Sequence, residues 1–128
     1  MYCNYSKDKF NNEVTFIIPS WLDLKAGSYS INDVEEPYTN EEESAFIRSL
    51  CYTEKEYLHL IQLGWTPQQA RQVLPNALKT ELVMTGFISD WKHFIDLRYR
   101  GTTGKPHPDA FYLAEKLYNL FKEKGIDV

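Results

Sequence analysis

The chain has 128 residues, enough for one ordinary domain, and its 43% apolar and 25% charged residues are typical of a folded protein rather than a disordered one. Fourteen Lys and Arg against 18 Asp and Glu give a net charge of −4, which argues against a general binder of nucleic acid or anionic membranes. No apolar run approaches the ~20 residues of a membrane span, and no signal-peptide pattern is visible. The two cysteines, Cys3 and Cys51, lie far apart and do not form a disulfide framework. We therefore expect a single domain over residues 1–128, located in the reducing cytoplasm.

The first predicted element is a short strand over residues 14–18, because these residues are β-branched or aromatic. Residues 21–38 are rich in Gly, Ser, Asn, Asp and Pro, which predicts an irregular loop. A long helix is predicted to follow, because apolar residues then recur at helical spacing. Thr39 and Glu42 have the spacing of a capping box at its start, and Gly64 is a typical helix stop.

A second helix is predicted from a Thr66 cap to Leu74. Thr66 and Gln69 again have capping-box spacing, and Pro67 occupies the first helical position, where its missing N–H costs nothing. Pro75 disfavours helical backbone at the residue before it, so this helix should end at Leu74.

In residues 79–85 successive side chains are expected to point alternately to two opposite sides of the backbone, which predicts a second strand. A third helix is predicted from a Ser89 cap to Arg98, and a fourth from Pro108 to Gly125 after a glycine-containing loop. Together these elements predict an α+β fold that is mainly helical, with two short antiparallel strands. Because two strands seldom form a stable sheet alone, the sheet domain is predicted to be incomplete by itself.

Two of the four arginines fall on apolar helix faces. On a wheel of ~100° per residue, Arg98 lies on the side of Trp91 and Ile95, and Arg71 lies on the side of Leu74. A guanidinium does not deprotonate, so an arginine turned inward must be paired. Either each arginine forms a structural ion pair with an acid, or the two line a buried anion site.

The local charge favours the anion site. Between residues 91 and 107 Asp96 is the only acid, and the cations are Lys92, Arg98, Arg100 and Lys105. The planar fork of arginine suits a phosphate or an enolate-like oxygen. A basic stretch in an acidic chain indicates a small anionic ligand rather than a long polyanion.

Residues 101–105 resemble part of a phosphate-binding loop, but only two residues separate the glycines and Pro106 follows the lysine. An NTPase is therefore rejected, although the backbone N–H groups of this loop remain possible phosphate contacts. The histidines His59, His93 and His107 lack metal-ligand spacing with one another or with the cysteines, so no metal is predicted. His93 and His107 flank the basic stretch and are candidate ligand contacts.

Several blocks of the sequence resemble the C-terminal half of flavin-dependent thymidylate synthases. They are residues 70–75 (ARQVLP), 76–81 (NALKTE) and 94–98 (FIDLR), and residues 2–6 resemble the stretch that follows the signature of that family. The spacing between the blocks also fits, and the resemblance extends from Tyr2 into the predicted fourth helix.

The resemblance implies a reaction in which no protein group acts as nucleophile. Reduced FAD mediates transfer of a methylene from methylenetetrahydrofolate to deoxyuridine monophosphate (dUMP), and NADPH re-reduces the flavin. Arg71 would help to bind dUMP, and Arg98 would be the catalytic arginine that contacts and activates the uracil. His93 and His107 match positions associated with cofactor binding, and family members are homotetramers with sites built between subunits.

The sequence also departs from the family pattern. It contains no Arg-His-Arg signature, and Met1 stands where an arginine of that signature would be. Residues 87–89 replace a common Asn-Ala-Arg, and residues 101–105 resemble an insertion. These departures predict a C-terminal fragment, a truncated expression product or the second half of a split gene. The isolated chain is expected to have little or no activity unless a front half pairs with it.

Two other functions remain open at this stage. A non-catalytic nucleotide-binding or oligomerisation module could retain the fold without the chemistry. A small helical DNA-binding module is also conceivable, because the predicted helix after Thr66 has a glutamine-rich face, but the acidic balance disfavours it. The expected partners are therefore dUMP, a folate and further copies or a front half of the enzyme, with no nucleic acid and no membrane.

Overall fold

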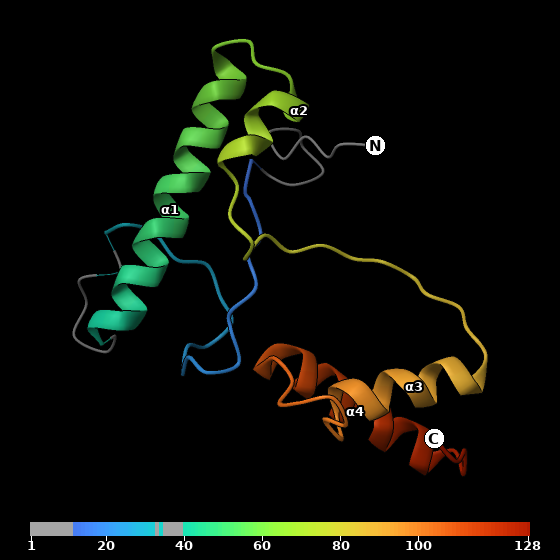
Figure 1. Ribbon diagram of the computed structural model, residues 1–128. Helices are drawn as coiled ribbons and strands as arrows, with labels where there is room; N and C mark the ends of the chain where they lie inside the picture. The colour runs from blue at the N-terminus through green and yellow to red at the C-terminus, as the bar shows by residue number, and fades with distance from the viewer. Residues whose placement is uncertain (1–11, 33, 35–39) are drawn as a thin grey trace. The chain divides into compact units, whose positions relative to one another are not determined.

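The computed structural model describes residues 12–32, 34 and 40–128, which contain four α-helices and one 3-10 turn (Figure 1). The chain divides into two compact units. The first unit comprises Met1–Ile18 and Leu22–Thr80, and the second comprises Pro19–Trp21 and Glu81–Val128. The single domain expected over residues 1–128 remains a prediction. No helix in the described ranges is long and apolar enough to cross a membrane.

The first helix, α1 (Glu41–Gln62), begins with a capping box one residue later than predicted. The Oδ1 of Asn40 accepts the Glu43 N–H at 2.9 Å, and the Glu43 carboxylate accepts the Asn40 N–H at 3.3 Å. Thr39, the predicted cap, lies outside the described residues. Asn40 and Glu43 have the same spacing as Thr39 and Glu42, so sequence alone left the register open. Gly64 follows the helix with φ of 95°, the left-handed backbone that favours glycine at a helix end.

The second predicted helix is present as a single α-turn, α2 (Pro67–Ala70), followed by a 3-10 turn, η2 (Arg71–Val73). The capping box of Thr66 and Gln69 is confirmed: the Gln69 N–H donates to Thr66 Oγ1 at 3.3 Å, and the Thr66 N–H donates to Gln69 Oε1 at 2.9 Å. Leu74 has an extended ψ of 134°, as expected for the residue before Pro75.

The core of the first unit lies where α1, α2 and the segment after Asn12 meet. Tyr57 of α1 and Ala70 of α2 are fully buried, and Val14 packs with them. The Val14 N–H donates to the Glu54 carboxylate of α1 at 2.7 Å, which ties the segment to the helix. Partly buried apolar side chains complete this core: Phe16, Leu58, Leu60, Ile61, Leu74 and Leu78.

The predicted pair of strands is wrong. In the part of the chain that the structure describes there is no β-strand, only one antiparallel bridge between Phe16 and Leu78. Two backbone hydrogen bonds flank it, from Ile17 N to Ala77 O at 2.7 Å and from Lys79 N to Thr15 O at 2.9 Å. The alternating pattern of residues 79–85 favours extended backbone, but a ladder also needs a second strand alongside, and within the described residues no ladder extends beyond the bridge. The mainly helical character of the fold is as predicted.

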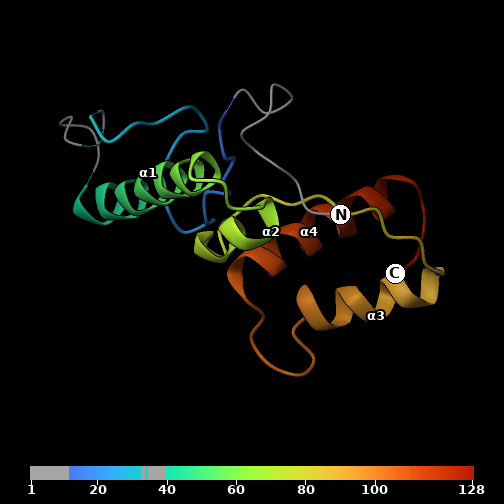
Figure 2. The same cartoon turned by 90° about the horizontal axis from the view of Figure 1, so that it is seen from above.

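The second unit contains α3 (Ile88–Arg98) and α4 (Pro108–Glu123), which pack against each other (Figure 2). Ser89, the predicted cap, lies inside α3 instead. The Asp90 carboxylate accepts the Phe87 N–H at 2.8 Å, so Phe87 is the N-cap and the helix begins two residues earlier than predicted. Ile95 of α3 and Ala114 of α4 are both fully buried.

Candidate functional site

Arg98 is the last residue of α3, and its side chain is exposed rather than turned inward. The apolar side of the helix is as predicted, with Ile95 fully buried and Trp91 half-buried. The wheel fails at Arg98 because the helix ends there, and a long side chain in the last turn reaches past the packed face into water. Among the described residues no carboxylate forms an ion pair with Arg98. Its guanidinium is therefore open to an anion.

Arg71 is also exposed, so the predicted pair of inward arginines is wrong. The wheel assumes a continuous α-helix, whereas the backbone tightens into the 3-10 turn η2 at Arg71 and the angular spacing changes. Ala70, one residue earlier, is fully buried, and Leu74 is half-buried. Arg71 belongs to the first unit and Arg98 to the second.

The guanidinium of Arg100, two residues beyond Arg98, is already occupied by contacts within the second unit. It donates to the Asp96 carboxylate at 2.5 Å and to the Val128 carbonyl at 2.6 Å, and it lies 5.5 Å from the centre of the Tyr118 ring. The hydrogen bond with Asp96 raises the pKa of Arg100 above its ordinary value. Of the two guanidinium groups at this end of α3, Arg98 is the one available to a ligand.

Aromatic stacking fixes the same end of α3 to α4. The ring of Tyr99, the residue between the two arginines, lies 5.5 Å from that of Phe111 and 4.7 Å from that of Tyr118, with both pairs stacked. Stacked pairs of this kind each stabilise by ~0.5–1.5 kcal/mol beyond the area they bury. The backbone that carries Arg98 is thus held firmly while its side chain remains in solvent.

The loop after α3 folds back on that helix. The Thr102 N–H donates to the Asp96 carbonyl at 3.1 Å, and the Gly104 N–H donates to the Gly101 carbonyl at 3.0 Å. Gly101 has φ of 66°, and a Cβ there would approach the Gly104 carbonyl to 3.0 Å, so the turn requires glycine. Because two of the loop N–H groups are occupied, the exposed Lys105 is the better anion contact of this segment.

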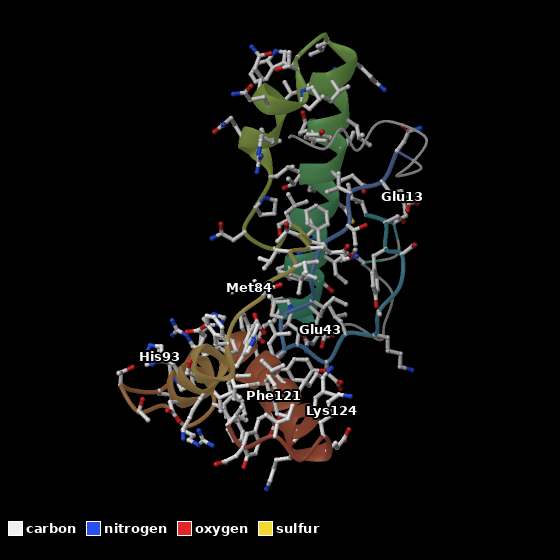
Figure 3. All side chains as sticks on the ribbon, turned by 90° about the vertical axis from the view of Figure 1, so that its right-hand side faces the viewer. Glu13, Glu43, Met84, His93, Phe121 and Lys124 are labelled. Atoms are coloured by element: carbon white, nitrogen blue, oxygen red, sulfur yellow. The ribbon has the colours of Figure 1, made fainter. Side chains whose placement is uncertain are left out.

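The two candidate histidines differ in their surroundings. His93 lies exposed on α3 (Figure 3). His107 caps α4: its Nδ1 accepts the Asp109 N–H at 3.3 Å, and its ring meets the edge of Trp21 with the centroids 5.7 Å apart. A role for either histidine at a cofactor remains a prediction. No group of three His, Cys, Asp or Glu in the described ranges could hold a metal ion.

Asp109 beside this cap makes the second unit sensitive to acid. Its carboxylate accepts the Ser20 N–H at 2.8 Å, and this hydrogen bond lowers the pKa of Asp109 below its ordinary value. A carboxyl whose pKa is lower in the folded state stabilises the fold above its unfolded pKa of about 3.9, and this contribution is lost as pH falls through the folded pKa. We expect the thermal midpoint to fall more steeply between ~pH 5 and ~pH 2.5 in the wild type than in Asp109→Asn, which cannot ionise. Equal slopes in differential scanning calorimetry would contradict this assignment.

One further feature, a cavity of about 530 Å³ in the first unit, was not predicted from the sequence. It lies beside α1 and is lined mainly by apolar side chains, with Cys51 and the carboxylates of Glu13 and Glu54 among its walls.

Comparison with known proteins places these observations in a family. The family described as "Thymidylate synthase complementing protein" matches residues 1–124. A probable flavin-dependent thymidylate synthase from Paramecium bursaria Chlorella virus 1 is 27% identical over 81 residues, which are 63% of this chain and 36% of that relative. The match thus spans little more than a third of the length of the relative. No solved structure matches the chain. Because the family match covers nearly every residue, the chain belongs to the thymidylate synthase complementing protein family, as the resemblance in its sequence predicted.

Proposed function

We propose that the chain is part of a flavin-dependent thymidylate synthase that converts dUMP to dTMP with methylenetetrahydrofolate and NADPH. Support comes from the family match over residues 1–124 and from the similarity to the probable flavin-dependent thymidylate synthase of the virus. The observation that carries the proposal is Arg98, whose exposed guanidinium has no carboxylate partner among the described residues while Arg100 beside it is occupied.

Arg98 suits the activation of a uracil ring. Its two-pronged donor can hold a carbonyl oxygen through two N–H groups, and its charge persists at any physiological pH. A fixed positive charge beside that oxygen stabilises the negative charge that develops on the ring as its carbon attacks. Arg71 is proposed to pair with the phosphate of dUMP.

FAD, when bound, would supply the redox chemistry of the transfer. The described residues fit such a cofactor in part: the ring of His93 is exposed and can donate or accept at a flavin edge, and His107 keeps Nε2 for the same purpose. The sequence holds no Arg-His-Arg, so we propose that the isolated chain has little turnover and that a second polypeptide supplies this part of the site. We also propose that the chain forms a homo-oligomer, as the family resemblance implies.

Calorimetric titration tests the nucleotide assignment. The chain is expected to give saturable heat with dUMP and at least ~10-fold weaker binding with deoxyuridine, which lacks the phosphate that Arg71 would pair with. Equal affinity for the two compounds would contradict the proposed phosphate contact. Saturable heat with neither would contradict nucleotide binding and favour a non-catalytic oligomerisation module.

A further inference from the structure

The cavity of the first unit is formed by three separate segments of the chain. They are residues 13–18, residues 24–29 and the part of α1 from Phe46 to Glu54. The Val14 N–H donates to the Glu54 carboxylate at 2.7 Å, and the Cys51 thiol donates to the Tyr29 carbonyl at 3.6 Å. Because these two bonds join both other segments to α1, the walls of the cavity are held in place without a ligand.

The size and the lining of this cavity suit a small organic molecule. Its volume of about 530 Å³ falls within the ~300–1,000 Å³ that is typical of small-molecule sites. Most of the lining side chains are apolar, and three of them are aromatic: Phe16, Tyr29 and Phe46. A ligand with an aromatic body would therefore gain free energy by leaving water for this space.

The charged groups of the cavity indicate the charge of that ligand. The carboxylates of Glu13 and Glu54 line it, and no Lys, Arg or His is among the described residues in its walls. Within the described ranges neither carboxylate forms an ion pair. Glu13 lies on the segment beside α1 (Figure 3), and Glu54 accepts the Val14 N–H through Oε2. The lining therefore complements a cation, which the faces of aromatic rings also attract.

We propose that this cavity binds a small organic cation with an aromatic body, of the arylalkylamine class. The ring would lie among the apolar side chains, and the ammonium group would donate to Glu13 and Glu54. The nucleotide of the proposed reaction carries a phosphate, which these carboxylates would repel. The inference therefore concerns a second site, and it does not depend on the proposed reaction.

Three indole compounds that differ in charge test the proposal in titrations followed by amide NMR shifts. Tryptamine, the cation, is expected to bind with a dissociation constant below ~1 mM. Tryptophol, the neutral alcohol, should bind at least ~10-fold more weakly, and the anion indolepropionate should bind more weakly still. A dissociation constant above ~1 mM for tryptamine, or equal affinities for tryptamine and tryptophol, overturns the proposal.

Substitution of the carboxylates tests where the ammonium group binds. The double variant Glu13→Gln with Glu54→Gln keeps the side-chain shapes, and the amide oxygen at residue 54 can still accept the Val14 N–H, so the fold should persist. This variant should bind tryptamine at least ~10-fold more weakly and tryptophol within about twofold of the wild type. Glu56→Gln is the matched control, since Glu56 is exposed on α1 and outside the cavity. Unchanged tryptamine affinity in the double variant, or an equal loss in Glu56→Gln, overturns the site.

The thiol of Cys51 reports whether the amine occupies the cavity. In a Cys3→Ser background, tryptamine at ~10 times its dissociation constant should slow the alkylation of Cys51 by iodoacetamide ~10-fold, because only about a tenth of the chain is then free. Alkylation at an unchanged rate would show that the amine binds elsewhere, which also overturns the proposal.

Discussion

Replacing Arg98 by alanine is expected to weaken dUMP binding by ~30- to 150-fold, because a charge-assisted hydrogen-bonding pair contributes ~2–3 kcal/mol. Arg98→Lys should recover part of the affinity, since it keeps the charge and loses the two-pronged geometry. Titration calorimetry with dUMP measures both. The proposed role of Arg98 would be refuted by an Arg98→Ala chain that binds dUMP as the wild type does.

A matched control separates a specific contact from a general change in charge. Arg48→Ala removes the same charge from α1 and should leave dUMP affinity unchanged within about twofold. Because Arg98 is exposed and has no carboxylate partner in the described ranges, Arg98→Ala should also shift the free energy of unfolding by no more than ~0.5 kcal/mol. If both alanine variants lost binding equally, the loss would reflect net charge and not the site.

The second large effect is expected in the core of the first unit. Tyr57 is fully buried and packs with Val14 and Ala70, so Tyr57→Ala should destabilise the unit by ~3–5 kcal/mol through lost burial and the cavity left behind. Tyr57→Phe, which keeps the ring, should cost much less, about 1 kcal/mol. Urea unfolding followed by circular dichroism measures both variants. A loss below ~1 kcal/mol in Tyr57→Ala would show that this core contributes little.

Local signals predicted the helices well. Thr66, Pro67 and Gln69 placed the start of α2 correctly, because capping acts between neighbours in sequence. Gly64 likewise marked the end of α1. The strands failed for a physical reason: alternation predicts extended backbone, whereas a ladder depends on a second backbone that no local pattern supplies.

The candidate site was predicted in part. The sequence correctly predicted the apolar side of α3, including Ile95. It wrongly predicted that Arg98 faces the interior, because a helical wheel takes no account of side-chain length or of where the helix ends. It could not show that Arg100 is occupied, since its partners are Asp96 and the distant Val128. The functional roles of Arg71 and Arg98 came from family resemblance and remain to be tested.

The bond between Arg100 and the Val128 carbonyl has a practical consequence. Val128 is only 4% exposed and is tied directly to the turn that presents Arg98. Arg100 therefore joins two segments of the second unit that lie far apart in sequence, the end of α3 and the stretch after α4. Variants used in assays of nucleotide affinity should keep Arg100, because its loss would release both segments.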